Sequence, residues 1–179
     1  MVELDANKLW KSLPDLDTKN VQFERAVVRN VTVGNQYLVS GAFAKAATKV
    51  GVDPTGAAAF GLVTGIPFSL RIARERLLIA CQDEGALSAG WHEDGYAVTE
   101  MSGAFSVFEI SGKGAIDLVK RGTTSAPGEP SQSAAINFAG MTTYLYRFCS
   151  DDVVRLHVDR TLTPYLWEWF DTLYETATL

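Results

Sequence analysis

The stretch GYAVTEMSGAFSVFEISGKGAIDLVKRGTT, residues 95–124, decides the fold of this chain together with two later segments. These are SAAINFAGMTTYLYRF, residues 133–148, and VVRLHVDRTLTPYLWEWFDTLYETA, residues 153–177. Their order predicts a strand, a helix, a loop, a hairpin, a strand and a closing aromatic helix. None of the three segments contains a pattern that is typical of a catalytic site.

The closing segments give the most regular patterns. Residues 154–158 alternate between Val or Leu and polar residues, which predicts a half-buried strand with Arg155 and His157 on its outward face. The final helix is predicted over residues 163–175, with Pro164 at its first position. Ser111 is a natural N-cap for a helix over residues 112–120.

The first half of the chain predicts a similar mixture of short elements. Gly34 and Asn35 predict the turn of a hairpin between strands 26–33 and 36–40. The other expected elements are a helix at 41–50, a loop at 51–67, strands at 70–72 and 76–81, and a short helix at 83–91.

These elements together predict an α+β fold, an antiparallel sheet with helices packed on it. We expect an N-terminal arm over residues 1–25, followed by one α+β domain over residues 26–179. That domain divides, at most, into sub-units 26–95 and 96–179.

The composition argues against several classes of protein. The chain of 179 residues carries a net charge of −5, which disfavours nucleic-acid binding. It contains no apolar run long enough to span a membrane and no apolar leader, so we expect a cytoplasmic protein. Cys81 and Cys149 have no Cys or His partner at metal-binding spacing, so no metal site is expected.

Aromatic residues on the closing helix suggest a contact with another protein. Leu162, Leu166, Trp169 and Leu173 share one helical face and are predicted to form its buried side. Trp167 and Tyr174 then lie on the far side, so we expect them to contact a partner chain. Packing of the two rings under the N-terminal arm is the alternative.

Several segments, taken in order, resemble the gamma subunit of heterotetrameric sarcosine oxidase. Ile110–Ala115 is similar to that family's L-S-G-P-G-A, Leu118–Gly122 to its L-L-A-K-G, and Leu166–Phe170 to its L-W-E-W-L. Val98–Ser102 resembles V-T-D-V-S, with Glu100 in place of the aspartate. The family is related to the folate-binding aminomethyltransferase (glycine-cleavage T-protein) fold, so the resemblance implies the N-terminal part of that fold.

The resemblance also implies a function. It implies a non-catalytic small subunit of a bacterial flavin- and folate-dependent oxidase that acts on sarcosine or a related N-methyl amine. The implied partners are larger oxidase subunits that carry tetrahydrofolate and flavin, with no cofactor on this chain alone. Asp83 belongs to the acidic pair that the family also has, so Asp83 and Glu100 are candidate folate or ligand contacts. Residues 140–144 lack the carboxylate that faces folate in the related enzymes, so no catalytic residue is assigned.

Two other functions stay open. One is a stand-alone tetrahydrofolate-binding protein of the aminomethyltransferase type, with Glu100 or Asp83 as the base. The other is a structural protein that associates with further copies of itself. Titration with tetrahydrofolate and light scattering, respectively, would test them.

Overall fold

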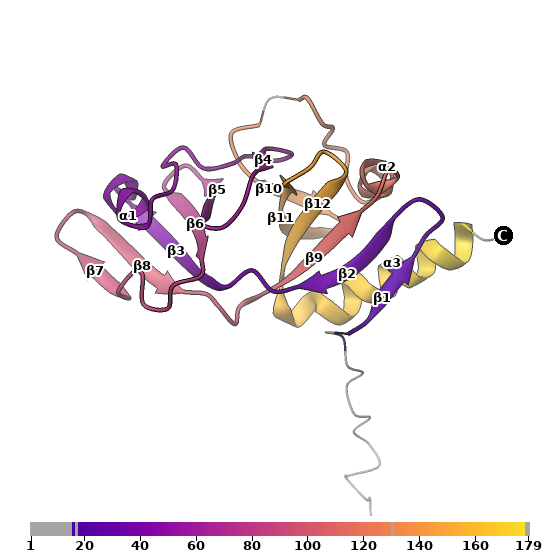
Figure 1. Cartoon of the computed structure of the whole chain (residues 1–179), viewed down its shortest axis with the longest axis horizontal. Helices are drawn as coiled ribbons and strands as arrows, with labels where there is room; N and C mark the ends of the chain where they lie inside the picture. Colours follow the sequence, from indigo (N-terminus) through magenta and orange to yellow (C-terminus); the bar gives the residue numbers. More distant parts are fainter. Residues whose placement is uncertain (1–15, 17, 130, 178–179) are drawn as a thin grey trace, which may run out of the picture.

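The computed structural model describes residues 16, 18–129 and 131–177, and it contains two mainly antiparallel sheets that lie side by side (Figure 1). The predicted N-terminal arm falls mostly outside these residues. Its last part forms β1, which pairs with β2. The predicted α+β class, with antiparallel strands and helices packed on them, is confirmed.

The seven-stranded sheet, here called the large sheet, combines strands from both ends of the chain. In spatial order its strands are β1 (Asn20–Gln22), β2 (Val27–Val31), β9 (Phe105–Ser111), β12 (Val153–Asp159), β11 (Met141–Phe148) and β10 (Ala135–Phe138). The short strand β4 (Leu62–Val63) pairs with β11 in parallel. The predicted hairpin at 134–148 is confirmed as β10 and β11.

The five-stranded sheet, here called the small sheet, uses only residues from the first part of the chain. In spatial order its strands are β5 (Phe68–Ala73), β6 (Arg76–Cys81), β3 (Asn35–Gly41), β8 (Tyr96–Glu100) and β7 (Gly90–His92). Helix α1 (Ala44–Val50) ends at Gly51, as predicted, and buries Ala46 and Ala47 against this sheet.

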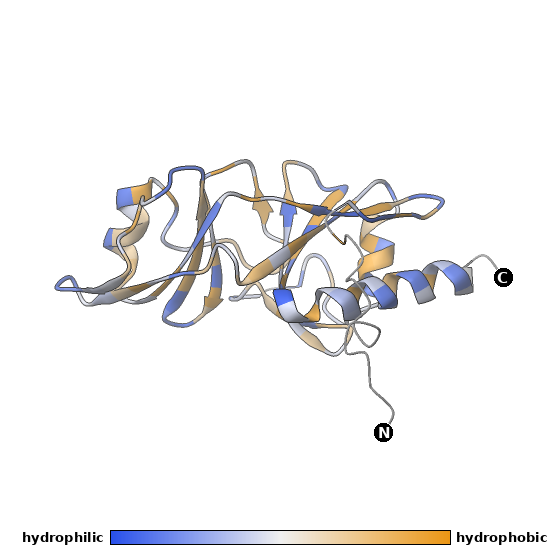
Figure 2. Ribbon diagram, turned by 90° about the horizontal axis from the view of Figure 1, so that it is seen from below, coloured by the Kyte–Doolittle hydropathy of each residue, from blue (hydrophilic) through white to orange (hydrophobic). Residues whose placement is uncertain are grey.

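The remaining helices cover one face of the large sheet. These are α2 (Ala115–Lys120), a short 3₁₀ turn (Arg160–Leu162) and α3 (Thr163–Ala177). Residues of α2 and α3 share a core cluster with Val28, Phe108 and Leu156 of the sheet. The outward surface of α3 is mostly hydrophilic (Figure 2).

The second face of the large sheet packs against the small sheet. A separate hydrophobic cluster contains Phe68, Leu70 and Leu78 of the small sheet. These side chains pack with Tyr146 of β11 and with Ala134, the residue directly before β10. Because of this packing, the central strands of the large sheet are covered on both faces, and β12 is almost completely buried.

Three local predictions are wrong. Strands β2 and β3 do not form a hairpin, because each pairs with distant strands in a different sheet. Gly34 belongs to the link between the sheets: it has φ of +79°, and a Cβ there would lie 2.5 Å from the Cys81 carbonyl oxygen. The helix predicted over 83–91 is replaced by turns and β7, with Gly85 and Gly90 at positive φ.

The third correction concerns the cap of α2. Ser111 ends strand β9, and the helix begins at Ala115 after Gly114, without a side-chain cap. Gly112, at φ of +114°, turns the chain between the strand and the helix.

The buried side of α3 also differs from the prediction. Trp167, expected on the exposed side, is 1% exposed and packs on Phe108, with ring centroids 4.9 Å apart. Leu166 and Phe170 are fully buried beside it, whereas Leu162 is 37% exposed. The buried stripe is Thr163, Leu166, Trp167 and Phe170, and Trp167 does not present a surface to a partner. The predicted Trp169 and Leu173 are half-buried and pack against the same core.

We predict that Trp167→Ala lowers the free energy of unfolding by about 3–5 kcal/mol, because the change opens a cavity in the packed core. Urea denaturation followed by circular dichroism measures this. Trp91→Ala is the matched control: Trp91 is 73% exposed, so its removal should change stability by no more than about 0.5 kcal/mol. Equal effects of the two substitutions would contradict the assignment of Trp167 to the core.

Candidate functional site

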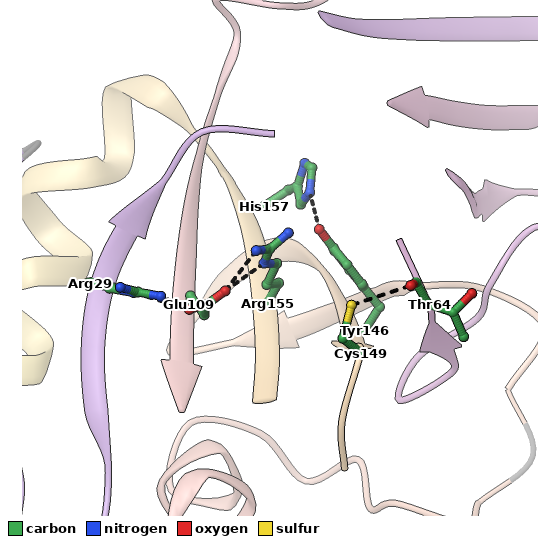
Figure 3. Close-up of polar contacts among 7 residues, drawn as sticks. All are labelled: Arg29, Thr64, Glu109, Tyr146, Cys149, Arg155 and His157. Carbon is green, nitrogen blue, oxygen red and sulfur yellow. Dashed lines mark hydrogen bonds and ion pairs between the residues drawn. The ribbon is translucent and has the colours of Figure 1, made fainter. Parts of the chain in front are cut away.

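A row of polar side chains crosses the face of the large sheet that is turned towards the small sheet (Figure 3). The strand register places Arg29 opposite Glu109, Glu109 opposite Arg155, and Arg155 opposite Tyr146. Directly opposed residues of neighbouring strands share a face and lie within side-chain reach. Four strands thus align one carboxylate, two guanidinium groups and one phenol.

Glu109 is the centre of the charged part of this row. Arg155 donates from Nε and Nη2 to its Oε2, at 2.9 and 2.8 Å, and Arg29 donates from Nε and Nη2 to its Oε1, at 3.1 and 2.6 Å. Burial opposes ionisation of Glu109, but the hydrogen bonds and charges of the two arginines outweigh it and lower the pKa of its carboxyl. Glu109 is therefore held as a carboxylate.

Arg155 is buried between that carboxylate and an aromatic ring. Its guanidinium carbon lies 3.4 Å from the centroid of the Phe148 ring, a cation–π contact. Its Nη1 is buried and has no hydrogen-bond partner within the residues that the structure describes. The planar guanidinium suits both the two hydrogen bonds to Oε2 and the stacking, which a lysine could not reproduce.

His157 connects the two sheets through two hydrogen bonds. Its Nε2 lies 3.1 Å from the Tyr146 hydroxyl, and its Nδ1 lies 3.0 Å from Gln36 Oε1. Because an amide oxygen can only accept, Nδ1 carries the proton and Nε2 accepts from the tyrosine. Gln36 belongs to β3, so this chain of hydrogen bonds joins the small sheet to β11 and β12.

The surroundings keep His157 and Tyr146 neutral. Burial, with a contribution from the charge of Arg155, lowers the pKa of His157 to about 3. Burial likewise raises the pKa of Tyr146 well above its ordinary value. His157 is 0% exposed and has Phe68 and Phe105 as aromatic neighbours, at 6.5 and 6.1 Å between ring centroids. These groups are sealed from solvent and serve to join the sheets.

The prediction that His157 lies on the outward, solvent-exposed face of its strand is wrong, because that face is buried against the small sheet. Alternation in β12 is real, but the small sheet covers the face that would otherwise be exposed. The sequence patterns do not single out Glu109, Arg155 or Gln36 as site residues. The one signal available was Glu109 itself, a charged residue inside the otherwise apolar run of β9.

The two candidate ligand-contacting carboxylates lie at one end of the small sheet. Glu100 ends β8 opposite Tyr37, and Asp83 follows β6 in an exposed turn. Asp83 lines a shallow hollow with Lys49 and Pro67, and Glu100 is not part of that hollow. Glu100 instead accepts a 3.4 Å hydrogen bond from Ser102. Their role in folate or ligand binding stays a prediction.

Tyr174 lies near the end of α3 and is 42% exposed. Its ring packs edge-on against Phe23, with centroids 5.8 Å apart. Its predicted contact with a partner chain stays a prediction, now without Trp167 beside it.

Among residues 16, 18–129 and 131–177, no three His, Cys, Asp or Glu side chains are grouped so that they could hold an ion. No helix within these residues is both long and apolar enough to cross a membrane.

The fold and the sealed polar centre define an α+β scaffold of two packed antiparallel sheets. A solved structure with this fold is a chain of the heterotetrameric sarcosine oxidase from Corynebacterium sp. U-96, in complex with pyrrole 2-carboxylate. The match has a TM-score of 0.67 and 18% sequence identity, and it covers 86% of each chain. Neither a protein-family model nor a curated protein matches this sequence. At this identity, the likeness shows the shared fold.

We predict that Glu109→Gln lowers the free energy of unfolding at pH 7 by about 3–5 kcal/mol, because two arginines then lose their buried counter-charge. The pKa of Glu109 is lowered in the folded state, so this stabilisation is present above its ordinary pKa of 4.5. It is lost as the pH falls through the folded-state value. Urea midpoints at several pH values measure both effects, and Glu168→Gln, on the exposed side of α3, is the control. Equal midpoints for wild type and Glu109→Gln at pH 7 would refute the prediction.

A second prediction concerns His157. Its folded-state pKa is lowered from 6.5 to about 3, so the unfolded chain binds one more proton between these values. This contribution to stability is complete above pH 6.5 and falls by up to about 1.4 kcal/mol per pH unit below it. His157→Gln should lower by one the number of protons taken up on unfolding between pH 3 and pH 6.5. Tyr146→Phe keeps the imidazole and should leave that number unchanged. An unchanged slope in His157→Gln would show that the histidine is not the titrating group.

Proposed function

We propose that this chain is a non-catalytic small subunit of a multi-subunit amine oxidase, of the type that demethylates sarcosine or a related N-methyl amine. The observation that carries the proposal is the fold, which is shared with a chain of a heterotetrameric sarcosine oxidase. Coverage is 86% in both directions, so the matched chain has nearly the same length as this one. A match of that size supports correspondence with a small subunit rather than with a domain of a large one.

The nature of the polar centre supports an accessory role. Its histidine and tyrosine are buried, neutral and bonded to each other, so they cannot exchange protons with a substrate. The Glu109 carboxylate is already saturated by two arginines. In the proposed complex, the flavin and tetrahydrofolate chemistry therefore belongs to larger subunits, and this chain contributes a rigid surface.

To test the proposal, an affinity tag is placed on this chain in the cells that naturally produce it, and the native complex is purified through that tag. We expect larger subunits with flavin absorbance to co-purify, and the complex to form hydrogen peroxide when sarcosine or another N-methyl amine is added. The isolated chain should show no turnover.

Two results would contradict the proposal. The first is a chain that elutes alone or only with copies of itself. The second is a chain that binds tetrahydrofolate and transfers a one-carbon group unaided, with loss of that activity in Asp83→Asn or Glu100→Gln.

A further inference from the structure

Two of the links between the sheets run side by side near the middle of the molecule (Figure 1). Residues 32–34 join β2 to β3, and residues 101–104 join β8 to β9. Met101 N donates to the Gln36 carbonyl oxygen at 2.7 Å, and Gln36 N donates to Ser102 Oγ at 3.1 Å. These hydrogen bonds fix the two links relative to each other.

A pocket lies where the first of these links leaves the large sheet. β2 pairs with β9 only as far as Val31 and Val107, whereas β9 continues along β12 to Phe105. The first residues of β9 therefore have no strand on their β2 side. A pocket of about 260 Å³, here called the link pocket, is lined there by residues of β2, of β9 and of both links, together with Arg160. It is slightly smaller than the pockets that hold drug-sized molecules, so it suits a small ligand.

The side chain of Gln36 offers a hydrogen-bond donor to the link pocket. Gln36 is only 3% exposed, and its Oε1 accepts from His157 Nδ1, which fixes the orientation of the amide. Its Nε2 donates to no other residue in the described part of the chain. This nitrogen is not among the side-chain atoms that are completely buried without a partner, so it is accessible from the pocket that Gln36 lines. A buried amide nitrogen left without an acceptor is costly, which favours a ligand that supplies one.

Arg160 gives the link pocket a positive charge. It directly follows β12 and is exposed, so it stands at the opening of the pocket, whereas Gln36 lies at its base. Its guanidinium forms neither an ion pair nor a hydrogen bond within residues 16, 18–129 and 131–177. No Asp or Glu lines the pocket. Glu100 accepts a 3.4 Å hydrogen bond from the lining residue Ser102, but it lies outside the lining itself.

Two hydroxyl groups add further donors. Ser106 Oγ accepts from Thr163 Oγ1 at 2.7 Å, so its own hydrogen is available to a ligand. The Thr32 hydroxyl forms no hydrogen bond within the described residues. Asn30 also lines the pocket, but its unpartnered Oδ1 is completely buried and offers no acceptor there. The side chains of the link pocket therefore present mainly donors.

Donors around a single positive charge select a small anion. A carboxylate carries one negative charge, and its two oxygens match the donors of a guanidinium group. Sulfate and phosphate carry more charge, which a lone arginine on a chain of net charge −5 does not balance. Val33, Phe105 and Val107 line the same pocket, and such side chains suit a short apolar body.

We infer that the link pocket binds a small carboxylate with a short apolar body, whose oxygens accept from Gln36 Nε2 and from the Arg160 guanidinium. Gln36 also accepts from His157, so the bound carboxylate adds a partner to the joint between the two sheets. A ligand that binds only the folded chain stabilises it. The inference concerns this chain alone and does not depend on the proposed function.

The experiment titrates the full chain with sodium acetate, butyrate and benzoate at constant ionic strength, which sodium chloride maintains. At least one carboxylate should raise the melting temperature saturably, and the neutral amide of the same acid should bind at least about tenfold more weakly. The side-chain amide signal of Gln36 in ¹⁵N–¹H spectra should shift with the same midpoint.

Three results of this titration would overturn the inference. The first is that none of the three carboxylates binds saturably. The second is that the neutral amides bind as tightly as the acids. The third is that inorganic phosphate binds more tightly than every carboxylate, which would refute the class of ligand.

Arg160→Gln tests the charge at the opening. It should weaken carboxylate binding by about tenfold or more, because a charge-assisted hydrogen bond is lost at an exposed position. Arg74→Gln is the matched control, since Arg74 is also exposed but lies outside the link pocket. It removes the same charge and should bind as wild type does. Equal losses in the two variants would mean that net charge, and not the pocket, governs binding.

Gln36→Glu tests the base of the pocket. The glutamate keeps an oxygen for His157 Nδ1 but replaces the amide donor with a second oxygen, so carboxylate binding should be lost. Circular dichroism checks that the variant is folded, and retained binding in the folded variant would contradict the inference. If the variant does not fold, the comparison of Arg160→Gln with Arg74→Gln and the Gln36 amide signal of wild type decide the question.

Discussion

The arrangement of the whole molecule depends on the hydrogen bonds that His157 makes to Gln36 and Tyr146. The two sheets meet mainly through apolar side chains, whose contacts are not directional. At one edge, Ala134 N also donates to the Arg71 carbonyl oxygen. A buried imidazole with two fixed partners supplies the direction, since any slip of one sheet would leave a polar group unpaired in an apolar surrounding. The orientation of the small sheet, and with it the position of β7 at the end of the molecule, follows from this joint.

The charged row on β2, β9 and β12 performs a related task within one sheet. Its members come from parts of the chain 80 and 46 residues apart, and the carboxylate of Glu109 is satisfied only when both arginines are in place. Such a row favours one strand order over others, because exchanging strands would bury an unpaired charge. Stability comes mainly from the core under α3, and specificity of pairing comes from the polar row.

The sequence was sufficient for elements whose pattern reflects only local contacts. The hairpin at 134–148, the helix that ends at Gly51 and the α+β class all follow from alternation, turn residues and helical spacing. The errors arise where a distant segment decides burial. Alternation in β12 cannot reveal that a second sheet covers its polar face, and the helical spacing of α3 does not show that Trp167 is buried while Leu162 is exposed. The hairpin predicted at Gly34 is wrong for the same reason, because pairing with later strands decides the structure. β2 pairs with β9, and β3 pairs with β6 and β8.

The strand order of the two sheets also determines when each can form during synthesis. All five strands of the small sheet come from residues 35–100, so that sheet can be complete before residues 101–179 exist. The large sheet must wait, because β2 pairs with β9, β9 in turn pairs with β12, and β12 is made almost at the end. Long-range pairing of this kind closes slowly. The early strands β1 and β2 therefore have only each other as partners until β9 is made, and the small sheet, which carries Trp91, is the first part of the molecule to acquire its native shape.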